Sequence, residues 1–175
     1  MAETSTPSGT GAPVDLHVDA NRQIAGRLGW VWKEIRRGYA NNAMRELIFE
    51  SDKFSIEPGQ FDTLEQLVFH ESIRMGDLAD ALRIDPSTAT RAVQRLIKDG
   101  LAEKMTHEGD GRVVFVGPTA HGQELYRWVV ERRRNVVLAV MEELPENRRA
   151  EVVNALEEFS GAIDKAVGRL LRDKH

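Results

Sequence analysis

Apolar residues recur at every third or fourth position along most of this chain, which is the spacing that places them on one face of an α-helix. Residues 43–49 either continue the first helix or form a separate piece, and residues 51–53 then interrupt the helical period. Two short stretches have the composition of β-strands and follow one another closely. The helices predicted by this pattern cover residues 20–39, 58–70, 77–82, 86–99, 119–143 and about 146–172, and the strands cover 101–105 and 113–116.

The helix predicted over residues 86–99 has clear signals for its start and its end. Asp85 is a favourable N-cap residue, because its carboxylate accepts hydrogen bonds from free amide groups of the first turn. Pro86 suits the first helical position, where no amide hydrogen is needed. Gly100 follows the last turn, where a residue without a Cβ atom adopts a left-handed cap at least cost.

The two faces of this helix differ sharply. The spacing predicts a buried face formed by Ala89, Val93, Leu96 and Ile97. The opposite face is polar and includes three cations but no carboxylate, in a chain whose net charge is −4. Its residues are Ser87, Thr90, Arg91, Gln94, Arg95 and Lys98. Because a solvated helix face usually mixes both signs of charge, this face is predicted to contact a polyanion. The alternative is an ordinary solvated face.

The segments around this helix indicate a known DNA-binding motif. A shorter helix, 77–82, precedes it across a turn of about three residues, which is typical of a helix-turn-helix whose second helix enters the major groove. The two strands follow directly and are joined by a predicted turn at residues 107–111, so they form the hairpin called a wing. The predicted fold is therefore mainly α with a small β-wing: a winged helix-turn-helix flanked by long terminal helices.

Four segments are expected along the chain. Residues 1–19 are predicted to be a disordered tail, because their first part is rich in Ser, Thr, Gly and Pro. Residues 20–55 form a helical dimerisation and linking segment, 56–118 the winged domain, and 119–175 the helices that complete the dimerisation lobe. The terminal helices have more apolar positions than a winged domain of about 60 residues can cover. We therefore expect a homodimer, since closed two-fold dimers are the commonest oligomers.

Composition narrows the function further. The chain has no cysteine, which excludes disulfides and thiolate metal sites. No signal peptide and no apolar run of membrane-spanning length is recognised, so we expect a cytoplasmic protein that does not contact a membrane. The five histidines show no metal-ligand spacing, and no catalytic set of residues is evident, so we expect no metal, no cofactor and no enzymatic activity.

An ordered series of short motifs runs along the winged segment. The series begins at Ile56 and Pro58 and includes Leu78-Ala79 and Gly100-Leu101. Its other members are Gly59-Gln60-Phe61, Leu64, Leu82, Asp85-Pro86-Ser87-Thr88, Thr90-Arg91, Leu96, Asp110, Arg112, Pro118-Thr119 and Gly122. This series resembles the MarR (multiple antibiotic resistance regulator) family of transcriptional regulators. The resemblance implies a homodimer that places two recognition helices and two wings on a pseudo-palindromic operator. Many proteins of this family are repressors that release DNA when a small, often aromatic ligand binds between the dimerisation and DNA-binding lobes.

The sequence departs from the family pattern in the wing and before the first helix of the motif. The family usually has two arginines after the wing aspartate, but here Gly111 replaces the first and only Arg112 remains. By resemblance, Asp110 shapes the wing, while Arg112 either contacts DNA or pairs only with Asp110. Arg74-Met75-Gly76 stands where a capping Thr or Ser is usual, and Met105 stands where a basic residue is common.

The residue types suggest individual roles at the DNA. Arg91 and Arg95 can each form two hydrogen bonds with guanine, and Gln94 can do so with adenine. Lys98 is expected to bind a phosphate. The hydroxyl groups of Ser87, Thr88 and Thr90 lie near the helix N-terminus, where they suit phosphate oxygens.

Trp30 and Trp32 are candidates for lining an effector pocket, although packing in the dimer core or against the winged domain is the alternative. Three functions remain open: a ligand-responsive DNA-binding repressor, a DNA-binding protein of this fold without an effector, and an interaction module that has lost DNA binding.

Overall fold

The computed structural model describes residues 13–105 and 114–173. The chain divides into two compact units, which we call the winged unit (residues 37–138) and the terminal unit (residues 1–36 and 139–175). Seven α-helices, one 3₁₀ turn and a three-stranded antiparallel sheet make up the described residues. The predicted fold class, mainly helical with a small sheet, is confirmed.

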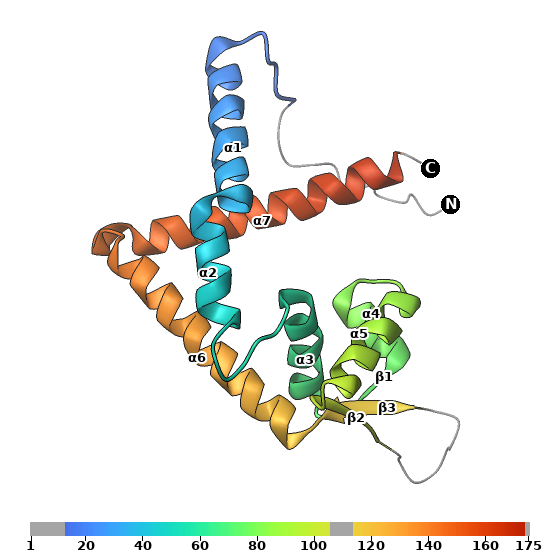
Figure 1. The fold of residues 1–175 in the computed structure, drawn as a ribbon. Helices are drawn as coiled ribbons and strands as arrows, with labels where there is room; N and C mark the ends of the chain where they lie inside the picture. The colour runs from blue at the N-terminus through green and yellow to red at the C-terminus, as the bar shows by residue number, and fades with distance from the viewer. Residues whose placement is uncertain (1–12, 106–113, 174–175) are drawn as a thin grey trace, which may run out of the picture. The chain divides into compact units, whose positions relative to one another are not determined.

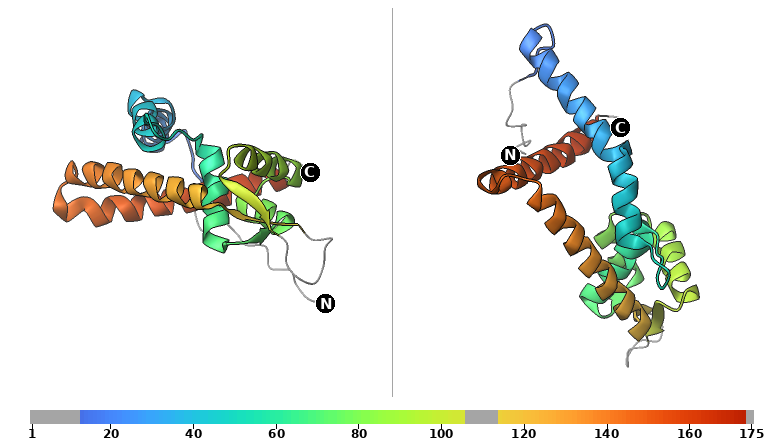
Figure 2. Two further views of the ribbon diagram at one scale, coloured as in Figure 1. Left: turned by 60° about the horizontal axis from the view of Figure 1, so that its bottom comes forward. Right: turned by 60° about the vertical axis from the view of Figure 1, so that its left-hand side comes forward.

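The winged unit contains α2 (Tyr39–Phe49), α3 (Pro58–His70), α4 (Met75–Leu82), α5 (Pro86–Lys98) and most of α6 (Ala120–Glu142). Its strands are β1 (Ile73–Arg74), β2 (Ala102–Met105) and β3 (Phe115–Pro118), in the spatial order β1-β3-β2. The strands and helices α3, α4 and α5 gather around the start of α6 (Figures 1 and 2). The unit thus extends beyond the winged segment predicted at residues 56–118, because α2 and α6 pack with it.

One apolar core holds the winged unit together. Fully buried side chains come from α3, α4, α5, the sheet and α6, and therefore join every layer of the motif. The largest of them are Phe61, Leu64, Leu67, Leu78, Leu96, Val116 and Val129. Burial of each such side chain contributes about 1.5–3 kcal/mol to folding. This core fixes α5 on its apolar side and leaves its polar side toward solvent.

The terminal unit contains most of α1 (Asp19–Arg37), the 3₁₀ turn η1 (Glu146–Arg148) and α7 (Arg149–Arg172). Where α1 passes α7 (Figure 1), the ring of Trp32 packs edge-on against Phe159 at a centroid distance of 5.6 Å. The Arg149 side chain donates to the carbonyl oxygens of Met141 and Leu144, which joins the two ends of the α6–α7 turn. None of the described helices is long and apolar enough to cross a membrane.

The predicted helices agree with the structure to within two residues at their ends, except that residues 146–148 form a 3₁₀ turn. Of the two alternatives for residues 43–49, the structure has the separate piece: they belong to α2, because Gly38 adopts an extended conformation and ends the first helix. The second wing strand, predicted at 113–116, instead spans Phe115–Pro118. The two-residue strand β1 was not predicted and exists by pairing Ile73 with Val116 of β3. The predicted turn at 107–111 lies outside the described residues.

Candidate nucleic-acid interface

Helix α5 begins and ends where its sequence signals predict. Asp85 caps the first turn, since its Oδ1 accepts a hydrogen bond of 3.0 Å from the backbone amide of Thr88. Pro86 occupies the first position of the helix. At the other end Gly100 has a positive φ of 71°, the left-handed conformation that glycine adopts without strain. The helix is therefore held at both ends by local interactions that the sequence encodes.

Burial follows the two predicted faces of α5. Ala89, Val93 and Leu96 are buried, and Ile97, also predicted to be buried, is partly buried against the same core. The polar residues are all exposed, and they follow one another along the outer side of the helix. They are Ser87, Thr88, Thr90, Arg91, Gln94, Arg95 and Lys98. Within the described ranges 13–105 and 114–173, none of the three cations among them has an ion-pair partner. They are therefore available to an anion from outside.

The hydroxyl groups at the start of α5 are engaged within the protein. Ser87 Oγ donates to Asp85 Oδ1 and Thr88 Oγ1 donates to Asp85 Oδ2, both at 2.5 Å. Thr90 Oγ1 donates to the carbonyl oxygen of Pro86 at 2.8 Å. The hydrogen bonds from Ser87 and Thr88 hold the pKa of the exposed Asp85 carboxyl well below its usual range. The hydrogens of all three hydroxyl groups are thus bonded to other atoms of the protein. The prediction from sequence was that these three residues bind phosphate.

Neighbouring elements hold α5 in place. Gln60 Nε2, in the first turn of α3, donates to Asp99 Oδ2 just beyond the end of α5 at 3.1 Å. Thr119 Oγ1 donates to the carbonyl oxygen of Gly100 at 2.7 Å and accepts from the amide of Gly122 at 3.0 Å, so the same hydroxyl caps α6. The start of α6 and the end of the recognition helix are therefore fastened together.

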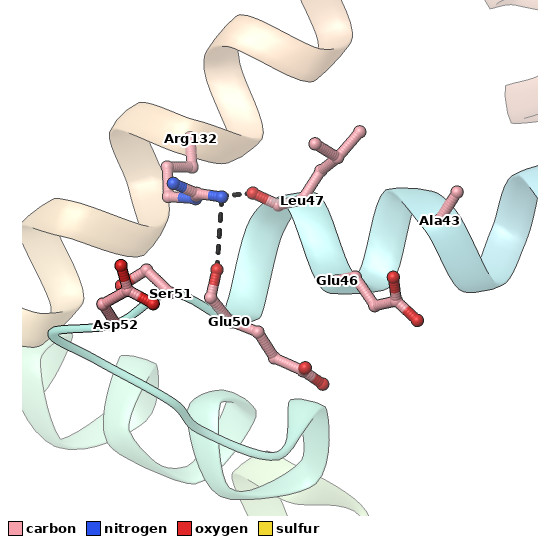
Figure 3. A pocket seen from close by; sticks show the side chains of 7 residues that line it. All are labelled: Ala43, Glu46, Leu47, Glu50, Ser51, Asp52 and Arg132. Carbon is pink, nitrogen blue, oxygen red and sulfur yellow. Dashed lines mark hydrogen bonds between the residues drawn. The ribbon is translucent and has the colours of Figure 1, made fainter.

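A contact that sequence reasoning missed joins α6 to the end of α2. Arg132 donates from Nε to the carbonyl oxygen of Leu47 at 2.5 Å and from Nη2 to that of Glu50 at 3.3 Å, as Figure 3 shows. Its guanidinium also lies 4.8 Å from the centroid of the Trp128 ring. The side chain borders an open cleft of about 600 Å³ beside Glu46 and Asp52. Leu47 and Arg132 are 85 residues apart, so no local pattern could have revealed the contact.

The wing is a β-hairpin whose base is described. Strands β2 and β3 pair antiparallel, with Ala102 opposite Pro118 and Met105 opposite Phe115. Lys104, a cation on β2, is exposed. Asp110 and Arg112, the predicted wing-shaping and wing-tip residues, lie outside the described residues, so their roles stay predictions. At the start of α4, Arg74 makes no side-chain capping hydrogen bond, as its residue type leads one to expect.

The two candidate effector residues differ in their surroundings. Trp32 packs on Phe159 within the terminal unit, so its role at an effector or in a dimer core stays a prediction. Trp30 is 64% exposed. Among the described side chains, no group of three or more His, Asp or Glu residues is arranged to hold a metal ion.

Comparison with known proteins now identifies the motif. The family model described as "MarR family" matches residues 56–114, which include α3, β1, α4, α5 and β2. The matched segment thus contains the whole helix-turn-helix and the polar face of α5. Residues 56–114 are therefore a winged helix-turn-helix segment of the MarR type. The relatives described next are transcriptional regulators, which accords with the expectation of no enzymatic activity.

Two similar proteins are described as HTH-type transcriptional regulators or repressors. An uncharacterized HTH-type transcriptional regulator of Mycobacterium leprae, ML2140, is 29% identical over 96 residues, which are 50% of this chain and 67% of the relative. The HTH-type transcriptional repressor MdtR of Bacillus subtilis is 21% identical over 119 residues, which are 68% of this chain and 77% of the repressor.

A solved structure agrees in fold. The crystal structure of Streptococcus pneumoniae FabT in complex with DNA superposes with a TM-score of 0.65, covering 83% of this chain and 98% of FabT at 17% identity. At this identity the likeness shows the MarR fold alone.

Proposed function

We propose that this protein is a homodimeric repressor of the MarR type that binds a pseudo-palindromic DNA operator through α5 and leaves it when a small ligand binds. The observation that carries the proposal is the outer face of α5. Every polar residue on it is exposed, three are cations, and the helix contains no carboxylate although the chain is net acidic. A locally basic face of this kind attracts the phosphate backbone and brings side chains to the bases.

The residues divide by chemistry into base readers and phosphate anchors. Arg91 and Arg95 present two-pronged donors that match O6 and N7 of guanine, and Gln94 matches N6 and N7 of adenine. Lys98, in the last turn of α5, binds a phosphate without reading sequence. Ser87, Thr88, Thr90 and Arg112 complete the proposed interface. The DNA-bound FabT structure and the repressor MdtR, both similar to this chain, support double-stranded DNA as the ligand and repression as the outcome.

The terminal helices supply the proposed dimer contact. Large apolar side chains on α1 and α7 are exposed in the single chain, where they would leave an extended apolar surface in water. On α1 they are Ile24, Leu28, Val31 and Ile35, and on α7 they are Val153, Leu156, Val167, Leu170 and Leu171. A second copy of the same chain would cover these faces, and an isologous two-fold contact needs no other partner. Dimerisation also supplies two recognition helices for the two half-sites.

Release by a small aromatic ligand is the remaining part of the proposal and is supported by the family resemblance. Trp30 is the candidate for contacting such a ligand, since its indole is largely exposed, whereas Trp32 already packs on Phe159. Titration of small aromatic acids into the protein–operator complex tests this part separately. A complex that no such acid dissociates would leave a constitutive DNA-binding protein of the same fold.

The experiment that tests DNA reading is footprinting on the DNA beside the protein's own gene at two salt concentrations. A two-fold-symmetric footprint with half-sites about one helical turn apart is expected. The variants Arg91→Ala and Arg95→Ala should lose the footprint while their helical content and dimer mass stay unchanged. Retained affinity in both variants would refute the proposed role of α5. If no footprint forms, selection from random duplex DNA decides whether another target exists or the protein no longer reads sequence.

A further inference from the structure

We infer that Arg74, in the short strand β1, is a phosphate anchor that holds the winged unit on the DNA backbone beside the recognition helix. The inference rests on the proposed function, since it requires α5 to enter the major groove. It adds to the proposed interface a cation that belongs to neither α5 nor the wing. The ligand is a backbone phosphate of double-stranded DNA, so Arg74 contributes affinity and position but reads no base.

The sheet places Arg74 on its outer face. In the antiparallel pairing Arg74 lies opposite Phe115 of β3, which in turn lies opposite Met105 of β2. Residues directly opposite one another point to the same face of a sheet, and neighbours along a strand point to opposite faces. Ile73 and Val116, which form the adjacent pair, are only 6% and 1% exposed. That pair faces the apolar core, so Arg74 and its two cross-strand neighbours face outward.

An aromatic ring holds the Arg74 side chain on this face. The guanidinium lies 5.3 Å from the centroid of the Phe115 ring, within the range of a cation–π contact. This contact uses no oxygen or nitrogen acceptor, so the N–H donors of the guanidinium remain for two hydrogen bonds to one phosphate. The ring also limits the motion of the side chain, so less side-chain freedom is lost when an anion binds.

The charge of Arg74 is not neutralised by a carboxylate of the described chain. Arg74 is exposed, and it takes part in none of the ion pairs found in residues 13–105 and 114–173. Asp77, in the first turn of α4, is the nearest acidic residue that follows Arg74 in sequence, yet no ion pair joins the two. A fixed and exposed cation of this kind attracts an anion from outside the protein.

The elements around Arg74 put it beside the DNA backbone rather than the bases. Strand β1 leads directly into α4 (Figure 1), and in a helix-turn-helix the first helix crosses the backbone while the second enters the major groove. On its other side β1 pairs with β3, the strand that returns from the wing. Arg74 therefore lies between the first helix of the motif and the wing. A guanidinium at this place would meet phosphate oxygens, whereas the base edges would be met by α5.

The test measures how full-length wild type, Arg74→Gln and Arg74→Lys bind the operator found by footprinting and an unrelated duplex, over a range of salt concentrations. Arg74→Gln should weaken binding to both duplexes about fivefold to tenfold per protomer at about 0.1 M salt. It should also reduce the salt slope by about one per protomer, because one phosphate contact is lost. Arg74→Lys keeps the charge and should keep the slope. Selection from random duplex DNA should return the same motif for all three proteins.

Two further variants separate this effect from changes in net charge and in side-chain position. Arg134→Gln removes one positive charge from an exposed position on α6 and should leave affinity and salt slope unchanged. Phe115→Leu removes the ring but keeps the charge, so it should weaken binding only about twofold to threefold without changing the slope. Circular dichroism checks that each variant is folded. Arg74→Thr, which places a good helix cap before α4, replaces Arg74→Gln if that variant does not fold.

Wild-type affinity and salt slope in Arg74→Gln would overturn the inference while DNA reading by α5 stands. A changed base preference at one position, with an unchanged slope, would make Arg74 a base reader and also overturn it. Equal losses in Arg74→Gln and Arg134→Gln would show a general effect of net charge, with the same consequence. If the wild type prefers no sequence over unrelated DNA, the proposed function fails and the inference falls with it.

Discussion

A Cβ atom at Gly122 would stand 2.0 Å from the carbonyl oxygen of Leu101. The first turn of α6 therefore lies directly on the backbone that leads from α5 into β2. The same carbonyl oxygen accepts from the amide of Thr119 at 3.0 Å, so the junction is bonded as well as close. Glycine is required at this position because there is no room for a Cβ atom. The backbone conformation does not require it, since the φ of Gly122 is not positive.

Gly122→Ala should therefore destabilise the winged unit. The added methyl group meets backbone atoms that cannot rotate away, and overpacking of this kind costs about 1–3 kcal/mol. Urea unfolding followed by circular dichroism measures the change. Gly59→Ala is the matched control, because a Cβ atom at Gly59 meets nothing within 4 Å. That variant should keep or slightly raise the free energy of unfolding, since alanine favours helix by up to about 1 kcal/mol. Equal stability of the two variants would contradict the close contact.

Local signals in the sequence predicted the elements whose ends are fixed by neighbouring residues. Helix α3 begins at Pro58 and ends at His70 as predicted, and α5 begins after the Asp85 cap. The polar face of α5 was also predicted, because one helical period assigns both faces. What escaped prediction depends on partners distant in sequence. Strand β1 has only two residues and no period of its own, so it exists only through its pairing with β3.

The second wing strand extends beyond the segment predicted from sequence. The prediction ended at residue 116, yet Gly117 and Pro118 both belong to β3. A Cβ atom at Gly117 would stand 2.4 Å from Met105 Sδ and 2.5 Å from the carbonyl oxygen of Glu71. Glycine is thus needed for close packing on two sides rather than for a turn. No sequence pattern distinguishes these two uses.

The Asp85 cap predicts a stability that depends on acid pH. The pKa of Asp85 in the folded protein lies below its ordinary value of 3.8, so the carboxylate stabilises the fold above that value and this stabilisation is lost as the pH falls below it. Asp85→Ala should lower the melting temperature at pH 7, and the difference from wild type should shrink below about pH 4. Asp85→Asn should melt near wild type at pH 7, since asparagine is an equal cap. A gap between wild type and Asp85→Ala that stays constant from neutral to strongly acid pH would refute the assignment.

The Arg132 contact predicts a local effect at the end of α2. Arg132→Ala removes two hydrogen bonds to the carbonyl oxygens of Leu47 and Glu50 and the contact with Trp128. Because the group is partly exposed, we expect a loss of about 1–2 kcal/mol, with faster hydrogen exchange in the last turn of α2. Arg134→Ala, at an exposed position of the same helix, should change stability by less than about 0.5 kcal/mol. Unchanged exchange in α2 of Arg132→Ala would show that the contact does not hold this helix end.

The exposed apolar face of α1 predicts that a single charge there prevents dimerisation. Leu28 is 47% exposed in the single chain and belongs to the apolar face that the second copy is proposed to cover. Leu28→Glu would place an unpaired carboxylate in that interface, where desolvation costs several kcal/mol, so the protein should sediment as a monomer at micromolar concentration.

Gln23→Glu adds the same charge on the polar side of α1 and should remain a dimer. The monomeric variant should also bind one operator half-site only weakly, because two recognition helices no longer act together. If Leu28→Glu remained a dimer with wild-type operator affinity, the proposed role of the apolar face of α1 would be wrong, and the contact between copies would have to be sought on α7.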